Sequence, residues 1–390
     1  MRIVFLADGR SPIAINWIRY FCDQGDEVHL ASFYPCQIAL PLASLKIIHL
    51  PFLVAGDYTV PAEKKLLSHL LPVQIRTALR QRLVPYGINK AAMEFREWVQ
   101  QIHPQLIHAM RIPYEGMVAA AADLDVPLIV SVWGNDFTLH APSTPRMGKL
   151  TRQTLERLDG LFADCQRDIK LAKAWGFPLD RSAQVFPGAG GVRRDIFRPP
   201  THPAIRENGP LLIQPRGIRA YVRNDVFFQA IAKVQSQIPE LRVICPAMAG
   251  VKEALGWVKK YHLEKVVQLY PRQTPPEMAK LFQQAHIAVS LTEHDGTPNT
   301  LLEVMACGCF PIVGDLESLR EWITPAINGF VTPADDPSLA AELILDAFEN
   351  NELREKAAQI NVALIEKRAD YFKVMEKVRQ VYSAVAGVDS

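Results

Sequence analysis

Two acids in the segment DGTPNTLLEVMACG have the residue types and the spacing to bind a hydroxylated ligand. Asp295 lies in a predicted loop, and Glu303 follows eight positions later inside a predicted helix. A carboxylate near the first turn of a helix can accept two hydrogen bonds from a vicinal diol, and Asp295 can reach a second hydroxylated group. Alternatively, Glu303 is only a favourable first-turn acid and Asp295 an ordinary loop residue, each contributing roughly a few tenths of a kcal/mol.

The residues around these acids predict a strand, a loop and a helix. Residues 286–291 form a short apolar run typical of a buried parallel strand, and the helix begins at Pro298 and ends at Gly308. Ligands lie beyond the carboxyl ends of such strands, and helix N-termini attract anions, so the amides near Thr300 and Leu301 suit a phosphate. The pattern predicts a nucleotide sugar. We expect the binding site for this nucleotide sugar to be lined by Gly296, Thr297, Pro298, Asn299, Thr300 and Leu301.

Residues 290–343, SLTEHDGTPNTLLEVMACGCFPIVGDLESLREWITPAINGFVTPADDPSLAAEL, resemble the donor-site stretch of the family 4 retaining glycosyltransferases of GT-B fold. The resemblance implies an α/β protein with two Rossmann-like, doubly wound domains facing a central cleft. In that family the first of two such acids usually is a glutamate that contacts the transferred sugar, and the second binds the ribose hydroxyls. Glu303 matches the second acid. Asp295 replaces the first and is one methylene shorter, which leaves the identity of the sugar open.

Three arginines lie close together in the segment LLIQPRGIRAYVRND. A departing nucleoside diphosphate carries about two negative charges, which Arg, Lys and helix dipoles must meet if no metal does. We predict that Arg216 and Arg223 do so as catalytic groups, that Asp295 is a third catalytic residue, and that Arg219 binds the donor. The resembling family usually has a lysine about five residues after the first arginine. Tyr221 stands there, so Arg223 is the predicted substitute; the alternative is that these arginines are solvated or form salt bridges.

Other candidate site residues follow predicted strands. Arg272 follows the strand VVQLY, where the resemblance implies a contact to the base and where a plain turn is the alternative. Gly9, Arg10 and Ser11 follow the first strand and could approach a pyrophosphate. A lone histidine at a strand end, such as His108, is more often structural than functional. We assign these residues to the acceptor side: Trp133, Asn135, Asp136, His108 and Arg111.

The length of 390 residues predicts two domains, since one core rarely extends so far. Strand-like apolar runs alternate with helical patterns in both halves, which is typical of parallel sheets. Prolines at 199, 200, 203 and 210 mark a linker. The predicted organisation is an acceptor-side domain at 1–197, a linker at 198–210 and a nucleotide-sugar domain at 211–370, and the resemblance implies that a helix at 371–390 returns to the first domain.

Composition narrows the class of protein. A formal net charge of +2 argues against general nucleic-acid binding, and six cysteines without metal-ligand spacing fit free thiols in a reducing cytosol. No signal peptide or run of about 20 apolar residues is found, so we expect a cytoplasmic protein. The basic amphipathic segment 63–84 could place it peripherally at the inner face of the plasma membrane. The more ordinary alternative is a surface helix with its apolar face in the core.

Together these features predict a metal-independent, retaining hexosyltransferase that requires no cofactor. Its expected donor is UDP-glucose or a related UDP-sugar, and its expected acceptor is a glycan or lipid-linked glycan hydroxyl in polysaccharide biosynthesis. Asp123 and Asp125 form a DxD pattern in a polar turn, where acids are ordinary. One alternative is a catalytically weak nucleotide-sugar-binding partner subunit or sensor of the same fold. Another is a different GT-B activity, such as an epimerase or a phosphorylase.

Overall fold

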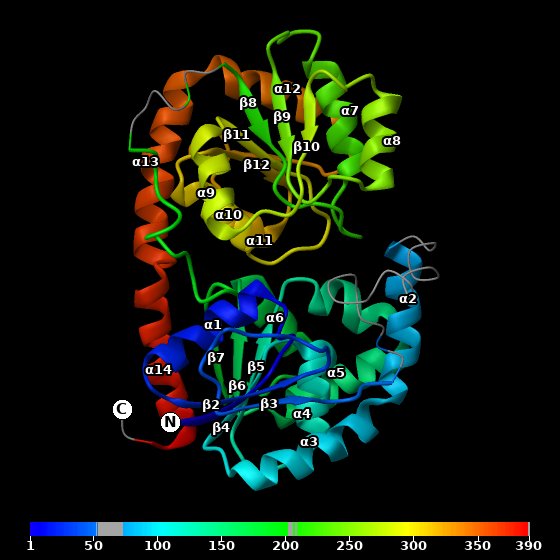
Figure 1. The fold of residues 1–390 in the computed structure, drawn as a ribbon, viewed down its shortest axis with the longest axis vertical. Helices are drawn as coiled ribbons and strands as arrows, with labels where there is room; N and C mark the ends of the chain where they lie inside the picture. The colour runs from blue at the N-terminus through cyan, green and yellow to red at the C-terminus, as the bar shows by residue number, and fades with distance from the viewer. Residues whose placement is uncertain (52, 54–72, 202–205, 207–208, 389–390) are drawn as a thin grey trace. The chain divides into compact units, whose positions relative to one another are not determined.

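The chain divides into two compact α/β units. The computed structural model describes residues 1–51, 53, 73–201, 206 and 209–388. One unit comprises Met1–Gly190 with Lys373–Ser390, and the other comprises Gly191–Phe372. Each contains one parallel sheet with helices packed against it (Figure 1). The predicted fold class, two Rossmann-like domains, is confirmed.

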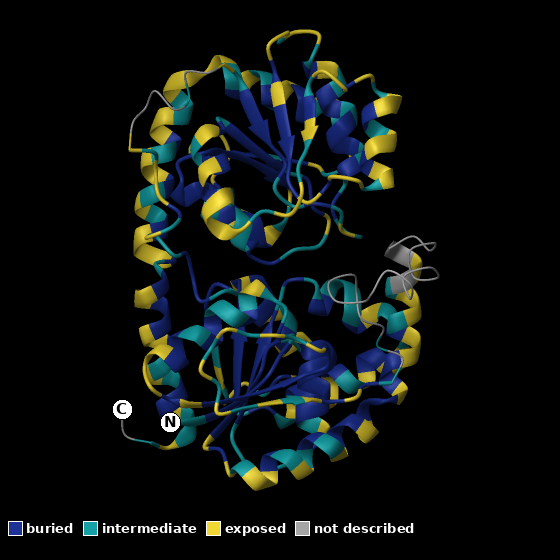
Figure 2. Ribbon diagram, viewed as in Figure 1, coloured by how far each residue is buried: buried dark blue, intermediate teal, exposed yellow. Residues whose placement is uncertain are grey.

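The sheet of the first unit has seven strands in the order β3-β2-β1-β4-β5-β6-β7, all parallel to their neighbours. Its central strands are almost entirely buried and mostly apolar, as expected where helices cover both faces. Figure 2 shows these strands dark blue and the outward faces of the helices yellow. The strands are β1 (Arg2–Leu6), β2 (Glu27–Ser32), β3 (Ser44–Ile47), β4 (Leu106–Ala109), β5 (Leu128–Val132), β6 (Gly160–Ala163) and β7 (Ser182–Val185).

The helices of the first unit begin and end at recognisable signals. Helix α1 starts after Ser11, whose side chain accepts the Ala14 N–H, and α5 starts after Thr144, whose side chain accepts the Met147 N–H. Their bounds are α1 (Pro12–Asp23), α2 (Val73–Leu83), α3 (Ile88–Ile102), α4 (Met117–Ala121), α5 (Pro145–Arg157), α6 (Gln166–Ala174) and α14 (Tyr371–Ala386), with short helical turns at Val84–Tyr86, Ile112–Gly116, Asp136–His140 and Ala141–Ser143.

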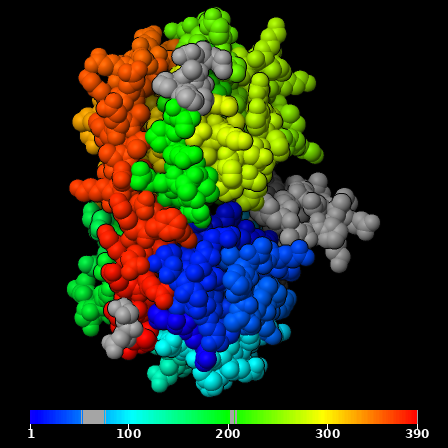
Figure 3. All heavy atoms as spheres, turned by 60° about the vertical axis from the view of Figure 1, so that its left-hand side comes forward, coloured from blue at the N-terminus to red at the C-terminus, as the bar shows by residue number. Residues whose placement is uncertain are grey.

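The last helix, α14, packs on the sheet of the first unit. Its Tyr382 is fully buried, accepts a hydrogen bond from Trp17 Nε1 at 3.0 Å and hydrogen-bonds His108. Arg379 on the same helix reaches the buried carboxylate of Asp26 at 2.6 Å. Figure 3 shows its red surface directly beside the blue surface of the N-terminal residues. From Lys373 onward this segment therefore belongs to the first unit.

The second unit has a six-stranded parallel sheet in the order β10-β9-β8-β11-β12-β13. The strands are β8 (Leu211–Ile213), β9 (Arg242–Cys245), β10 (Val267–Leu269), β11 (Ile287–Ser290), β12 (Phe310–Gly314) and β13 (Phe330–Thr332). The helices are α7 (Asn224–Val234), α8 (Lys252–Lys260), α9 (Pro275–Gln284), α10 (Asn299–Ala306), α11 (Glu317–Arg320), α12 (Pro337–Glu349) and α13 (Asn351–Arg368).

The boundary between the units lies before the predicted linker. Val192 forms a parallel bridge with Asp370, and Phe197 is buried in the core of the second unit. Because these contacts tie residues 191–197 to the second unit, the division falls after Gly190 and not after residue 197. The proline-rich segment 198–210 lies inside the second unit, and the structure describes only part of it.

Candidate functional site

A buried arginine connects two loops at the carboxyl ends of neighbouring strands β8 and β11. Arg216 donates from Nη2 to Asp295 Oδ2 at 2.6 Å and from Nη1 to Thr300 Oγ1 at 3.2 Å. Only 8% of its side chain and 14% of that of Asp295 are exposed. Its Nε is buried without a hydrogen-bond partner among the described residues. The structure therefore brings three of the predicted donor-site residues into direct contact.

The loop that follows β11 is held in place by side chains from α11 and beyond. Ser318 donates its hydroxyl to the Asp295 carbonyl at 2.8 Å, and Trp322 donates Nε1–H to Thr297 Oγ1 at 3.0 Å. Gly314 at the end of β12 allows the close approach, since a Cβ there would lie 2.4 Å from the Thr292 carbonyl oxygen. Asp295 is thus fixed through its backbone and its carboxylate.

Helix α10 begins at the predicted place and carries Glu303 in its second turn. Pro298 is the residue before its first turn, and Gly308 follows its end with a φ of +66°. Burial raises the pKa of Glu303 to about 8, and the guanidinium of Arg216 opposes this shift. Glu303 therefore lies within the electrostatic reach of Arg216, in surroundings that disfavour its charge.

The first turn of α10 offers fewer amides than the sequence predicts. Leu301 donates its N–H to the Pro298 carbonyl at 3.0 Å, so this amide is used inside the helix. The prediction that the Leu301 amide faces a phosphate is not supported by this geometry. Thr300, in the second position of the helix, contributes its hydroxyl to Arg216 and keeps its side chain at the site.

The other two arginines of the loop after β8 point elsewhere. Arg223 binds both oxygens of Asp225 at 2.9 and 2.8 Å and Glu293 at 3.0 Å. Its pKa is raised, mainly by the hydrogen bonds to Asp225. Arg219 is exposed and donates to the Arg216 carbonyl at 3.0 Å. The alternative of salt bridges thus describes Arg223 in this structure, and its catalytic role stays a prediction.

The remaining predicted donor residues lie in loops of both units. Arg272 is exposed after β10. In the first unit Gly9 donates its N–H to Ser32 Oγ at 3.2 Å, Arg10 pairs with Asp8 at 2.9 Å, and Ser11 caps α1. The Gly9 amide and the Ser11 hydroxyl therefore already have roles within the first unit, and a contact of these residues to the donor stays a prediction.

Most of the predicted acceptor-side residues gather beyond β4 and β5. Arg111 donates to Asp136 Oδ1 at 2.8 Å and to Asn135 Oδ1 at 2.9 Å, and it lies 5.6 Å from the ring centroid of Trp133. Asp136 is buried and also accepts the N–H groups of Ile112 and Trp133. Burial raises its pKa, which Arg111 opposes. Asp136 thus orients Arg111, and because its side chain is fully enclosed, this geometry corrects its assignment to the acceptor side.

His108 does not lie at the sheet edge where the sequence predicts it. Its ring is fully buried between Tyr382 and Ser131, whose Oγ lies 2.8 Å from Nε2. Burial lowers the pKa of His108 to about 3, so the ring is neutral near pH 7. The assignment of His108 to the acceptor side is wrong, because α14 covers it. The alternative, a structural histidine, is what the structure shows.

Comparisons with known proteins identify the family. A model of the group 1 glycosyl transferases matches residues 199–361, and a model of the glycosyl transferase 4-like domain matches residues 16–188. The chain belongs to the group 1 glycosyltransferases of GT-B fold. This family was predicted from residues 290–343, and the prediction is confirmed.

This glycosyltransferase is similar in structure to several solved proteins. Anabaena HepE in complex with UDP has a TM-score of 0.72 at 14% identity, covering 98% of this chain and 100% of that one. Sucrose-phosphate synthase from Thermosynechococcus elongatus has a TM-score of 0.76 at 13% identity, covering 99% of both chains. A phosphatidyl-myo-inositol mannosyltransferase from Mycobacterium tuberculosis is 32% identical over 91 residues, which is 22% of this chain and only 24% of that relative.

Sequence reasoning missed the residues that position the predicted donor-site groups of this glycosyltransferase. Gln214 accepts the Arg216 N–H at 2.9 Å, while Ser318 and Trp322 hold the loop before α10. Ser318 and Trp322 come from a segment more than 20 positions away from the groups that they orient. Both lie inside the stretch that resembles the family, which is the one signal that could have pointed to them.

The raised pKa of Glu303 predicts how stability depends on pH. The pKa of an unperturbed glutamate is about 4.3, so the folded glycosyltransferase holds a proton that the unfolded chain releases. This contribution to the free energy of unfolding is complete below about pH 4 and is lost as the pH rises towards 8. Because Gln mimics the protonated acid, Glu303→Gln should gain Tm relative to the wild type between about pH 5 and about pH 8.

Thermal melts of both proteins over that pH range measure the difference. Glu342→Gln, which changes an exposed acid on α12, is the matched control and should follow the wild-type profile. Parallel profiles for Glu303→Gln and the wild type would show that Glu303 is ionised in the folded protein.

Proposed function

We propose that this glycosyltransferase moves a hexose, with retention of configuration, from UDP-glucose or a related UDP-sugar to a hydroxyl of a glycan or lipid-linked glycan in polysaccharide biosynthesis. The observation that carries this proposal is the buried Arg216, with Asp295 and Thr300 at hydrogen-bond distance and its Nε unpaired among the described residues. A buried guanidinium with a donor to spare suits an anionic oxygen of a diphosphate. The similar protein HepE was solved in complex with UDP, which supports a uridine donor.

Each residue of the constellation has a separate proposed role. Arg216 and the first turn of α10 stabilise the negative charge of the departing UDP. Glu303 hydrogen-bonds the ribose hydroxyls, and Asp295 hydrogen-bonds the hexose. The acceptor oxygen attacks the anomeric carbon from the face that UDP leaves, so one C–O bond forms as the bond to the phosphate oxygen breaks, and the proton of the acceptor hydroxyl passes to the departing phosphate oxygen. Arg223 reaches that phosphate only by exchanging its present carboxylate partners for it.

A nucleotide-sugar-binding partner without turnover is the second candidate. The observation in its favour is that the Asp295 carboxylate already pairs with Arg216 at 2.6 Å. A binder of this kind retains UDP affinity and releases no UDP from the sugar donor. Turnover therefore separates the two candidates.

Substitutions of the two acids should have different effects on binding and on turnover. Glu303→Ala removes the two proposed hydrogen bonds to the ribose hydroxyls, so the Kd for UDP should rise about tenfold or more. Asp295→Ala should leave UDP affinity unchanged or tighter, because Arg216 becomes free for phosphate, yet slow UDP release from the sugar by about 100-fold or more. Calorimetry with a panel of nucleotide sugars first selects the donor. Calorimetry with UDP then measures the Kd, and an assay of released UDP measures turnover.

Asp295→Asn controls for folding, because it keeps the shape of the side chain. Unchanged UDP affinity in Glu303→Ala would remove the ribose role. Wild-type turnover in Asp295→Ala would show that this acid does not act on the sugar.

Retention and metal independence can be tested in one experiment. The sugar released from UDP-glucose to water should appear first as the anomer present in the donor, which proton NMR detects. Treatment with EDTA should leave the initial rate within about twofold, since arginine and helix N-termini meet the phosphate charge. Among the described residues, Asp164, Cys165 and Asp168 lie close enough to share a cation, but Asp168 already pairs with Arg167 at 2.7 Å. A rate lost on chelation and restored by a divalent cation would contradict metal independence.

We also place this protein on the cytoplasmic side, in peripheral contact with an anionic membrane through α2. Ile75, Leu79 and Leu83 on α2, and Tyr86 beyond it, are all more than 40% exposed and recur every three or four residues. Gln81 is the buried residue instead. In the described part of segment 63–84, Ile75, Leu79 and Leu83 are thus exposed while Val84 at its end is buried; residues 63–72 lie outside the described residues. The whole segment has five Lys and Arg against one Glu, which complements an anionic surface.

A double substitution on α2 should weaken vesicle binding. Ile75→Gln with Leu79→Gln removes two exposed apolar side chains, so affinity for vesicles of phosphatidylglycerol and phosphatidylcholine should fall about tenfold or more. Co-sedimentation measures this, and Leu179→Gln is the control because Leu179 is 80% exposed elsewhere in the first unit. Equal binding by the double variant would contradict the proposed contact. No helix among the described residues is long and apolar enough to cross a membrane.

A further inference from the structure

The loop that carries Asp295 is attached at two points to segment 315–328, and helix α13 holds that segment in turn. The two points are the hydrogen bonds from Ser318 to the Asp295 carbonyl and from Trp322 Nε1 to Thr297 Oγ1. Thr297 is 2% exposed and Trp322 is 5% exposed, so water has little access to the second bond. The position of the loop therefore depends on what fixes segment 315–328.

Arg368, the last residue of α13, covers the ring of Trp322. Its guanidinium carbon lies 4.1 Å from the ring centroid, and its Nη1 donates to the Glu321 carbonyl at 2.8 Å. A guanidinium is attracted to the face of an indole, and the hydrogen bond to the backbone of the preceding residue holds it there. Arg368 thus orients the indole whose Nε1–H binds Thr297.

A second residue of α13 holds the same segment. Asn361 lies two helical turns before Arg368, so both side chains lie on the same face of α13. Asn361 Nδ2 donates to the Asn328 carbonyl at 2.9 Å, and Asn328 Nδ2 donates to Asn361 Oδ1 at 2.8 Å and to the Trp322 carbonyl at 2.9 Å. Trp322 is therefore held at its backbone by Asn328 and at its ring by Arg368.

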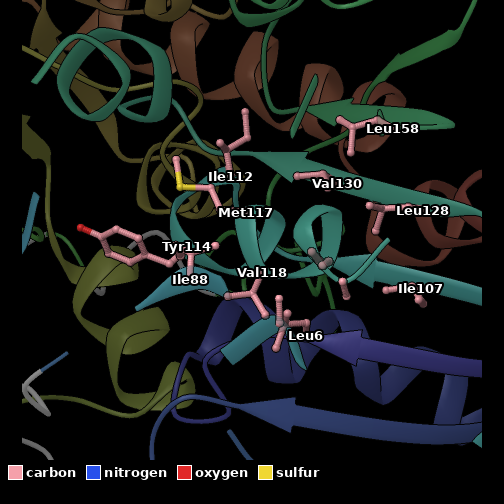
Figure 4. Packing of buried hydrophobic residues seen from close by; sticks show 14 of the residues in the cluster. Leu6, Ile88, Ile107, Ile112, Tyr114, Met117, Val118, Leu128, Val130 and Leu158 are labelled. Carbon is pink, nitrogen blue, oxygen red and sulfur yellow. The ribbon is translucent and has the colours of Figure 1, made fainter. Parts of the chain in front are cut away.

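The two residues of α13 differ in exposure, so only one of them can be changed without disturbing the core. Asn361 is fully buried, whereas Arg368 is exposed. A substitution of Arg368 removes its contacts to Trp322 and Glu321 without leaving a cavity inside the second unit. The hydrophobic cluster of the first unit, part of which Figure 4 shows, contains none of these residues. Both units should therefore stay folded when Arg368 is replaced.

We propose that Arg368 is a positioning residue for the transfer reaction, because through Trp322 it fixes Thr297 and holds the loop of Asp295 where the donor sugar binds. Arg368 itself touches no substrate in this role. The inference rests on the proposed function, since it takes Asp295 as the acid that hydrogen-bonds the hexose. Arg368 lies outside residues 290–343, on which the family resemblance rests, and outside residues 199–361, which match the family model.

Loss of this contact should affect the sugar and not UDP. Helix α13 also packs against α10, which carries Glu303. A general displacement of α13 would therefore weaken UDP binding as well, because Glu303 is the proposed ligand of the ribose. Loss of the Arg368 contact alone reaches only the loop of Asp295, so the affinity for UDP should stay at the wild-type level.

The test compares variants of the whole chain with UDP and with the sugar donor that the nucleotide-sugar panel selects. In Arg368→Gln the kcat/KM for the sugar donor should fall about fivefold and its Kd should rise about fivefold, while the Kd for UDP stays within about twofold. Arg368→Lys keeps a cation for the ring and should lose less. Lys367→Gln is the matched control, because it removes a cation from the neighbouring exposed position of α13. Released UDP, calorimetry without acceptor and thermal melts supply the measurements.

A double-mutant cycle shows whether Arg368 acts through the indole. Trp322→Phe keeps a ring for the guanidinium but removes the Nε1–H donor, and Thr297→Val removes the acceptor of the same hydrogen bond. If Arg368 acts through this bond, adding Arg368→Gln to either variant should cause no further loss. Thr297→Val decides the question if Trp322→Phe lowers the Tm.

Four results would overturn the proposal. These are wild-type values in Arg368→Gln, an equal loss in Lys367→Gln, additive losses in the double variants, and a weaker affinity for UDP together with a lower Tm, which would show that α13 as a whole has shifted. A wild type that binds the sugar donor without turnover refutes the proposed function separately. The ratio of the Kd for the sugar donor to the Kd for UDP still tests the role of Arg368 in that case, and an unchanged ratio in Arg368→Gln contradicts it.

Discussion

The burial of a guanidinium group is the constraint on which the predicted donor side of this glycosyltransferase depends. A charge removed from water is stable only beside an opposite charge and hydrogen-bond acceptors. Arg216 finds them in Asp295, which is 79 positions away, and in Thr300. Because loss of either ion-pair partner would leave the other charge buried, the loops after β8 and β11 are held together. Ser318 and Trp322 fix the second loop from its other side.

The first unit meets the same constraint with a different pairing. Asp136 is buried, and Arg111 supplies its counter-charge while two backbone N–H groups use its other oxygen. A carboxylate held in this way serves to orient its arginine, and has no lone pair directed at solvent to spare for a ligand. In both units, then, an acid that follows a strand holds an arginine at the carboxyl edge of the sheet. The two differ in burial, since the side chain of Asp295 is 14% exposed and that of Asp136 is fully enclosed.

Local sequence signals predict the strand, loop and helix around Asp295. The features that the sequence did not predict depend on contacts between residues far apart in the chain. About 25 consecutive residues contain the apolar run of β11, the start of α10 and its end at Gly308. Hydrophobic periodicity and helix capping act over this range, so they predict these elements. The edge strands β7 and β13 are not predicted by apolar periodicity, because their segments SAQV and FVT lack a long apolar run. His108 was misplaced, because the residue that covers it, Tyr382, lies 274 positions away. Asp225 lies only two positions after Arg223, and this spacing indicates the salt bridge that the two residues form. The interpretation of the three arginines as phosphate-binding groups overlooked it.

Two contacts explain why an aspartate at position 295 can replace the glutamate that is usual in the family. The backbone of Asp295 is fixed by the hydroxyl of Ser318, and its carboxylate reaches Arg216 at 2.6 Å. A glutamate on the same backbone would place its carboxylate one methylene farther out, so it could keep the ion pair only by folding back. Since a carboxylate has about four lone-pair positions, an aspartate here can hold the arginine and still accept a hydrogen bond from a sugar hydroxyl, provided that the sugar comes closer to the loop. In the role proposed for Asp295, the shorter side chain would thus constrain the distance of the hexose from the backbone, and through it which hydroxyl can be recognised.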